Sequence, residues 1–139
     1  MVSRVLVPMD DSDMAATALS FACETFPAAE LTVLHVAGGP TSYMGGAMSL
    51  VLSDDMDDAI AERAEPIFER AREIAAEADC AIETAVALGS PGKTIVSHAD
   101  GFDLVVIGSH SGGLASRLLL GNVAETVTKN APVPVTVVR

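Results

Sequence analysis

The sequence predicts an α/β fold: a single doubly wound domain over residues 1–139, built on a five-stranded parallel sheet in the order 3-2-1-4-5 with helices on both faces. Three observations predict it. Short apolar runs alternate with helical patterns along the chain. Most of the runs are continuous and rich in valine and leucine, as in strands buried on both faces of a parallel sheet. A chain of 139 residues also suffices for one hydrophobic core but not for two.

The first half of the chain predicts two strands, a helix and a long loop. A buried strand over 4–7 ends at a proline, and the acidic cluster at 10–13 favours the N-terminus of a helix. Apolar residues at helical spacing follow, and a second strand covers 31–36. The glycine-rich stretch over 37–53 is long for a loop, so we expect a flap near the functional site.

The second half continues the alternation. An apolar stripe from Ile60 to Ala78 predicts a long helix, in which Pro66 should cause a kink or mark the true start. Apolar and polar residues alternate over 81–88, which is typical of an edge or half-covered strand. The remaining elements are a helix over 93–99, a strand over 103–107, a helix over 123–130 and a last strand over 133–138.

Charge and hydropathy exclude two classes of partner. The chain has 8 Lys and Arg against 19 Asp and Glu, a net charge of −11, whereas nucleic-acid binding requires clustered basic residues. No apolar stretch approaches the roughly 18 to 20 residues of a membrane span, and acidic residues follow Met1 too soon for a signal peptide. We therefore expect a cytoplasmic protein with no nucleic-acid or membrane partner. The acidity fits either a surface adapted to high salt, as in halophiles, or ordinary solubility charge.

The cysteines and histidines do not predict a metal site. Cys23 and Cys80 lie far apart in the sequence without CxxC spacing, so we expect two reduced, half-buried thiols. His35, His98 and His110 share no metal-ligand spacing with one another or with the cysteines.

The expected topology predicts where a ligand binds. In a sheet of order 3-2-1-4-5 the direction of winding reverses between the first and fourth strands, and ligands bind at the carboxyl ends of the strands beside that reversal. Those ends are Pro8-Met9-Asp10 and Gly108-Ser109-His110. The glycine-bearing loop over 108–122 leads from a buried strand into a helix, an arrangement that presents backbone N–H groups to an anion.

Two common nucleotide signatures are not supported. The segment over 89–94, GSPGKT, has two residues between its glycines where a P-loop requires four, so a turn with Pro91 at a helix start explains it better. The dinucleotide pattern GxGxxG does not follow the first strand, which argues against NAD and FAD.

Four segments together resemble the universal stress protein family, and the likeness covers the whole chain. They are VLVPMDDSDMAATAL, LTVLHV, GSPGKTIVSHADGFDLVVIGSH and LLLGNVAETVTKNAPVPVTVVR. The resemblance implies a five-stranded parallel α/β fold and a homodimer formed through the last strand, 133–138. It also implies two branches, one binding ATP or AMP and one without nucleotide.

If this chain resembles the nucleotide-binding branch, the base and ribose would meet the ends of the first two strands, and the phosphates would meet the loop amides. The implied nucleotide-binding residues are Pro8, Met9, Asp10, Val36, Gly108, Ser109, His110, Ser111, Gly112, Gly121, Asn122 and Val123. Mg²⁺ or Mn²⁺ could accompany the nucleotide through its phosphates.

The chain departs from the pattern of that branch at two positions. Ser111 stands where the second glycine belongs, although Gly112 and Gly113 follow it, and Asn122 replaces a hydroxyl residue. The Asn122 amide could bind a phosphate. Asn122 with Glu125 also reads as a helix cap with an acidic partner, and capping alone would explain it.

The function that follows is a regulatory module that binds an adenine nucleotide, ATP or AMP, as part of a stress response. One alternative is a nucleotide-free dimerisation module of the same fold, which the missing glycine favours. A slow ATP hydrolase is less well supported, because only Asp10 and His110 could serve as catalytic groups. We therefore expect binding rather than catalysis.

Overall fold

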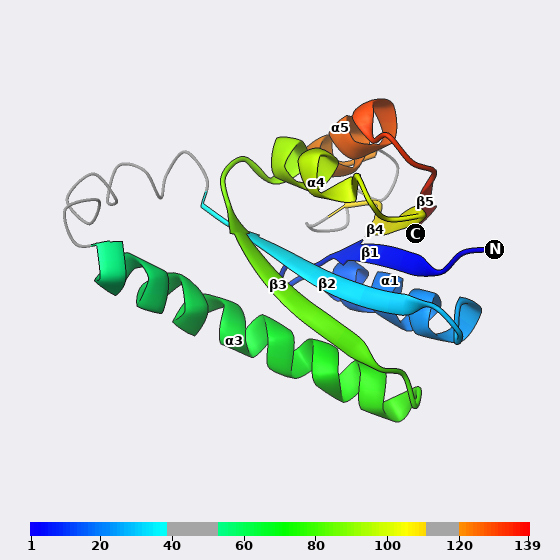
Figure 1. Ribbon diagram of the computed structural model, residues 1–139, viewed down its shortest axis with the longest axis horizontal. Helices are drawn as coiled ribbons and strands as arrows, with labels where there is room; N and C mark the ends of the chain where they lie inside the picture. The colour runs from blue at the N-terminus through cyan, green and yellow to red at the C-terminus, as the bar shows by residue number, and fades with distance from the viewer. Residues whose placement is uncertain (39–52, 111–119) are drawn as a thin grey trace.

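The computed structural model contains a parallel sheet with strand order β3-β2-β1-β4-β5 (Figure 1). It describes residues 1–38, 53–110 and 120–139. All four neighbouring strand pairs are parallel, as the alternation of strands and helices predicts. The elements are β1 (Arg4–Pro8), α1 (Asp13–Thr25), β2 (Glu30–Ala37), α3 (Ser53–Glu77), β3 (Ile82–Leu88), α4 (Pro91–Ala99), β4 (Leu104–Gly108), α5 (Asn122–Asn130) and β5 (Val135–Val138). The predicted fold class and strand order are therefore confirmed.

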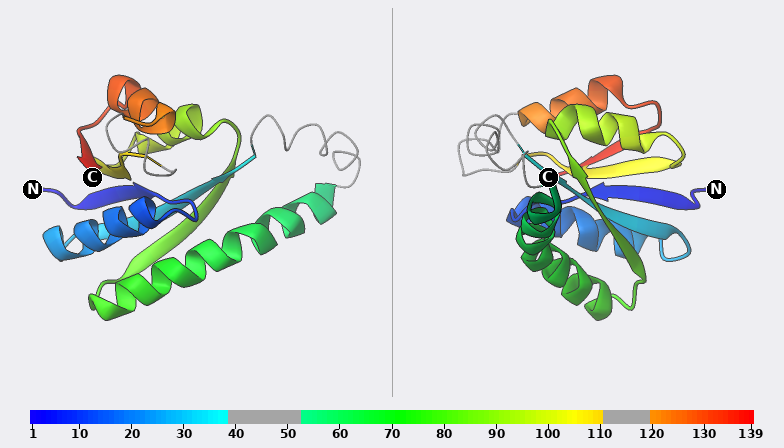
Figure 2. Two further views of the ribbon diagram at one scale, coloured as in Figure 1. Left: turned by 180° about the vertical axis from the view of Figure 1, so that it is seen from behind. Right: turned by 60° about the vertical axis from the view of Figure 1, so that its left-hand side comes forward.

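Helices cover both faces of the sheet (Figure 2). On one face, Val5, Val7 and Val33 pack with buried residues of α1 and α3. On the other face, Leu6 and Leu34 pack with buried residues of α4 and α5. Successive residues of β1 therefore enter opposite cores, which explains why this strand is a continuous apolar run.

The sheet has two different edges. Within the described residues, β3 pairs only with β2, and its exposure alternates along the strand, as expected for a half-covered edge. Val86 and Leu88 of β3 are 43% and 50% exposed. β5 forms the opposite edge and, among the strands that the structure describes, pairs only with β4. Val105 of β4 is in register with Val135.

The sequence predicts that Pro66 either kinks the long helix α3 or marks its start, and the structure contradicts the second possibility. It begins at Ser53 and continues through Pro66, so a helix start at Pro66 is wrong. The helix ends at Glu77, and Asp79 follows with φ of 52°. The flap predicted over 37–53 falls mainly on residues 39–52, which lie outside the described residues.

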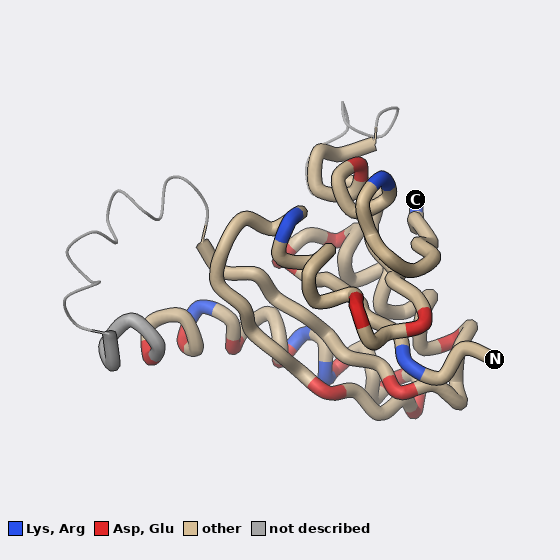
Figure 3. Tube along the Cα trace, turned by 45° about the horizontal axis from the view of Figure 1, so that its top comes forward, with Lys and Arg blue, Asp and Glu red and all other residues tan. Residues whose placement is uncertain are grey.

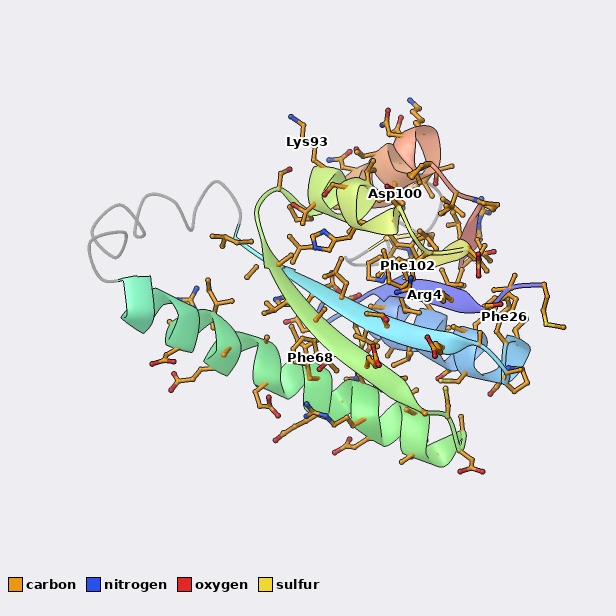
Figure 4. All side chains as sticks on the ribbon, in the orientation of Figure 1. Arg4, Phe26, Phe68, Lys93, Asp100 and Phe102 are labelled. Atoms are coloured by element: carbon orange, nitrogen blue, oxygen red, sulfur yellow. The ribbon has the colours of Figure 1, made fainter. Side chains whose placement is uncertain are left out.

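Polar contacts, here called the clamp, join the starts of β1 and β4 at the end of the sheet where the strands begin. Asp103 Oδ2 accepts hydrogen bonds from the backbone N–H groups of Ser3 and Arg4, each at 2.9 Å. Arg4 donates to the Gly101 carbonyl at 2.7 Å and lies over the ring of Phe102, 4.7 Å from its centroid (Figure 4). These contacts fix the start of β1 beside the start of β4.

In the described part of the chain, no helix is both long and apolar enough to cross a membrane.

Candidate functional site

A pocket of about 400 Å³ opens where β1 and β4 end. Its floor is formed by strand ends, and its walls by the first turns of α1, α4 and α5. It is lined by Pro8, Met9, Asp10, Ser12, Ala15, Leu34, His35, Val36, Pro91, Ile95, Ile107, Gly108, His110, Gly121, Asn122, Val123 and Ala124. The pocket therefore lies at the winding reversal from which the topology predicts a ligand site.

Most of the residues implied by the family resemblance come together in this pocket. The residues that line it are Pro8, Met9, Asp10, Val36, Gly108, His110, Gly121, Asn122 and Val123. Ser109 is 5% exposed and lies in the chain between two of them. Ser111 and Gly112 lie outside the described residues.

Asp10 is held in a fixed turn without capping α1. Its Oδ1 accepts a hydrogen bond from Ser12 N at 2.9 Å. The cap is Ser12, whose hydroxyl accepts from Ala15 N at 3.2 Å. Among the described residues, Asp10 Oδ2 has no hydrogen-bond partner, and Asp10 is half-buried in the pocket wall. The described part of the chain therefore occupies only one of the two carboxylate oxygens of Asp10.

A second contact anchors the turn that follows Asp10. Arg70 of α3 donates to Asp13 Oδ1 at 2.8 Å and to the Asp11 carbonyl at 3.2 Å. The Arg70 and Asp13 side chains are 39% and 97% exposed, so this ion pair contributes little free energy of folding. Its geometric effect is to tie the turn to the helix that covers the same face of the sheet.

The ends of β1 and β2 present backbone acceptors to the pocket. Met9 N donates to the Leu34 carbonyl at 2.8 Å, and His35 Nδ1 lies 3.0 Å from the Met9 carbonyl. Carbonyls two residues apart in a strand point the same way, so the Val36 carbonyl points to the β1 side, as that of Leu34 does. Because β1 ends at Pro8, opposite Leu34, the Val36 carbonyl faces space beyond the strand.

Hydrogen bonds bring the two ends of the loop after β4 together. Ser109 N donates to the Val138 carbonyl at 2.8 Å, and Gly121 N donates to the Ser109 carbonyl at 2.7 Å. Ser109 Oγ and His110 Nδ1 are 2.9 Å apart. A Cβ on Gly121 would lie 3.1 Å from the Ser109 carbonyl oxygen, so the close return of the chain favours glycine there. The first turn of α5 is thereby held beside the end of β4.

Among the described residues, no side chain caps the N-terminus of α5. Gly121 is the N-cap residue, and Asn122 is the first residue of the helix. The interpretation of Asn122 as a cap is therefore wrong, because the chain reaches helical geometry one residue earlier than that pattern requires. The first backbone N–H groups of a helix have no partner within it, and Asn122, Val123 and Ala124 all line the pocket. This arrangement suits an anion.

The electrostatics of the pocket are mixed. The described lining residues include one carboxylate, Asp10, two histidines, and neither Lys nor Arg. Glu125, in the first turn of α5, would oppose an anion there, but its carboxylate pairs with Lys129 at 2.7 Å. Lys129 holds the pKa of Glu125 below its ordinary value. Lys93 at the start of α4 points away from the sheet (Figure 4).

Acidic and basic positions lie together along α3 (Figure 3).

Within residues 1–38, 53–110 and 120–139, no group of three or more His, Cys, Asp or Glu side chains could hold a metal ion.

Eight lining residues are absent from the sequence-based set: Ser12, Ala15, Leu34, His35, Pro91, Ile95, Ile107 and Ala124. Pro91 and Ile95 belong to α4, which covers the apolar side of the pocket. One signal could have found Pro91, because a helix that follows a parallel strand begins at the carboxyl edge of the sheet. His35 had no such signal, since its contact with Met9 depends on the register of β1 with β2.

The comparisons with known proteins agree on one family. The family model described as the universal stress protein family matches residues 1–139. Universal stress protein YxiE of Bacillus subtilis is 34% identical over 148 residues, and the alignment covers 100% of both chains.

Solved structures share the fold. The universal stress protein UspA from Lactobacillus plantarum is 28% identical, with a TM-score of 0.74 over 99% of this chain and 98% of that one. The universal stress protein from Archaeoglobus fulgidus in complex with dAMP is 23% identical, with a TM-score of 0.70 over 100% and 98% of the two chains. At 23% identity, the likeness to the Archaeoglobus fulgidus structure shows the fold alone.

Proposed function

We propose that this chain, which belongs to the universal stress protein family, is a regulatory module that binds an adenine nucleotide where β1 and β4 end. One observation carries the proposal: the uncapped N-terminus of α5 and the ends of β1 and β2 line the same pocket. Solved universal stress proteins include complexes with cAMP, with dAMP and, from Arabidopsis thaliana, with AMP. A role in a stress response follows from the family.

The base and ribose would occupy the end of the pocket beside β1 and β2. The side chains of Met9, Leu34 and Ile95 provide apolar surface there for the faces of a purine. The Val36 carbonyl could accept a hydrogen bond from the exocyclic amine of adenine. Asp10 Oδ2 could accept one from a ribose hydroxyl, because Oδ1 is already engaged by Ser12 N.

The phosphate would lie at the N-terminus of α5. Backbone N–H groups of Asn122, Val123 and Ala124 and the positive end of the helix dipole favour a negative charge there. Since neither Lys nor Arg is among the described lining residues, a monophosphate fits this charge balance better than a bare triphosphate. ATP would bind with Mg²⁺ or Mn²⁺ on its phosphates, the metal being held by the nucleotide rather than by a cluster of side chains.

The size of the pocket supports a small ligand. Its volume of about 400 Å³ lies toward the lower end of the roughly 300–1,000 Å³ found for small-molecule sites. We therefore propose that the pocket holds one mononucleotide.

A homodimer through β5 is the second part of the proposal. Carbonyls of Pro134 and Val138 accept hydrogen bonds from the β4 side, at 3.0 and 2.8 Å. The peptide groups of Val135 and Val137 therefore face away from β4, toward the open edge of the sheet. An apolar edge strand with unpaired peptide groups is a template for a second copy. If nucleotide does not bind, this edge supports the alternative of a nucleotide-free dimerisation module.

Calorimetric titration with AMP and with ATP, each with and without Mg²⁺, separates these functions. The proposal predicts saturable AMP binding that is weakened in Asp10→Asn, a substitution that keeps the size of the side chain. A phosphate-release assay with ATP, comparing the wild type with Asp10→Ala, then tests the hydrolase alternative. Protein that retains its fold but binds neither nucleotide would leave the dimerisation module as the better account.

A further inference from the structure

β1 and β2 separate at the mouth of the pocket. Their last residues in register are Pro8 and Leu34, although β2 continues to Ala37. Beyond Leu34, β2 is still held by β3, because Val36 is in register with Ala87. The part of β2 that lines the pocket is therefore fixed by β3 after β1 has turned away from it.

The carbonyl of Met9 marks the point of separation. Met9 N–H donates to the Leu34 carbonyl at 2.8 Å, as a parallel ladder requires. The next bond of a regular ladder would run from Val36 N–H to the Met9 carbonyl. Among the described residues no backbone N–H makes that bond, and His35 Nδ1 lies 3.0 Å from the Met9 carbonyl instead. Because a carbonyl oxygen only accepts, Nδ1 carries the hydrogen and donates it.

The imidazole therefore takes the place of one ladder hydrogen bond. A backbone carbonyl at a half-closed site needs a donor, and His35 satisfies this one without bringing the two strands together. The peptide N–H and C=O of one strand residue point to the same side, so both groups of Val36 face the space that β1 leaves open. Met9, His35 and Val36 all line the pocket.

We propose that His35 is a positioning residue of the nucleotide site: by holding the Met9 carbonyl, it keeps the Val36 N–H out of the β1–β2 ladder and leaves it for the base. The inference rests on the proposed nucleotide function and adds a donor to the Val36 carbonyl. Adenine carries an acceptor nitrogen beside its exocyclic amine, so the two peptide groups of Val36 match it as a pair. His35 acts through Met9 and Val36, and its role requires no contact with the ligand.

Amide hydrogen exchange of the ligand-free protein, read by NMR, tests the effect of His35 on the ladder. In the wild type, the Val36 amide should exchange faster than that of Leu34, which lies in the paired part of β2. His35→Leu keeps a side chain of similar bulk but has no donor. In that variant the Met9 carbonyl should accept the Val36 N–H, and the Val36 amide should exchange about tenfold more slowly.

His35→Asn is the matched control. Its side-chain amide places an N–H donor close to the position of Nδ1 while removing the rest of the ring, so its Val36 amide should exchange as in the wild type. A Val36 amide that is as protected as Leu34 in the wild type, or that exchanges equally in the wild type and His35→Leu, would overturn the proposal. The wild-type measurement decides the matter even if His35→Leu does not fold.

Calorimetric titration with AMP tests the consequence for binding. His35→Leu should weaken AMP binding by roughly two- to tenfold, the effect of one lost hydrogen bond, and His35→Asn should bind as the wild type does. Circular dichroism checks that each variant is folded. Equal losses in both variants would show that the ring matters for a reason other than its Nδ1 donor, and would overturn the proposal, as would no loss in either.

The two proposals fail separately. A wild-type chain that binds no AMP would overturn the nucleotide site, while the exchange of the ligand-free protein would still show whether His35 controls the Val36 N–H. Normal AMP binding with a Val36 amide already protected in the ligand-free wild type would overturn the role of His35 alone.

Discussion

Gly108, the last residue of β4, packs directly against Met14 in the first turn of α1. A Cβ atom on Gly108 would lie 2.8 Å from Met14 Cγ and 3.1 Å from the Met14 carbonyl carbon and oxygen. The first glycine of the loop over 108–122 is thus required by helix packing, independently of any bound phosphate. The same contact holds α1 beside β4, and so helps to form the wall of the pocket that includes Ala15.

The substitution Gly108→Ala is expected to destabilise the fold by about 1–3 kcal/mol, the usual cost of overpacking a close contact. Urea unfolding monitored by circular dichroism measures it. Because the nearest atom is a flexible side-chain carbon, the double variant Gly108→Ala with Met14→Ala should cost less than the sum of the two single changes. Strictly additive costs would show that the Gly108–Met14 contact is not the cause.

Asp103→Asn tests the clamp that joins the starts of β1 and β4. Hydrogen bonds from the backbone N–H groups of Ser3 and then Arg4 lower the pKa of Asp103 below its ordinary value of 3.8. Because the folded pKa is the lower one, the carboxylate contributes stability above pH 3.8, and the contribution is lost as the pH falls through the folded pKa.

The variant should therefore have a lower urea midpoint than the wild type at pH 7, and the two midpoints should converge at a pH below the folded pKa. Equal differences at both pH values would mean that the charge of Asp103 has no role in the clamp.

Glu125→Gln tests the placement of a phosphate at the N-terminus of α5. Removing a negative charge from the first turn should strengthen AMP binding by a few-fold at low ionic strength, and added salt should reduce the difference. Glu83→Gln, at the start of β3, makes the same change in net charge at the other edge and end of the sheet. If both variants change the affinity equally, the effect belongs to net charge and not to α5.

The proposed dimer interface at β5 is tested by a matched pair of variants at Val137. Val137→Pro removes a backbone N–H that faces the open edge, while the hydrogen bonds of Pro134 and Val138 to the β4 side remain possible. Val137→Ala loses apolar surface but keeps the N–H. Light scattering after gel filtration should find Val137→Pro monomeric and Val137→Ala dimeric. A dimer that survives Val137→Pro would place the interface elsewhere.

The fold was predictable from the sequence because its local signals agree with its global arrangement. Continuous apolar runs such as Leu104–Ile107 have one good explanation in a chain of alternating strands and helices, and the winding rule then orders the sheet. Helix boundaries were less predictable. Pro66 breaks a helix by local rules, yet α3 continues through it, and its buried residues Ala64 and Phe68 pack on the same core on either side.

The position of the pocket at the candidate site was predictable where it depends on topology and not where it depends on register. The strand ends at Asp10 and Gly108 follow from strand order alone. The wall formed by Pro91 and Ile95, and the contact between His35 and Met9, depend on how far each strand and helix extends. Asn122 shows the same limit at single-residue scale, because a shift of one position turns a predicted cap into the first residue of the helix.

The most direct test of the central claim is an NMR titration of ¹⁵N-labelled protein with AMP, read residue by residue. We predict that the largest amide shift changes lie at Asp10, Val36 and residues 122–124, with small changes at the start of β3 and around Cys80. Shift changes centred away from the ends of β1 and β4, or none at saturating AMP, would contradict a nucleotide site formed by these strand ends and the N-terminus of α5.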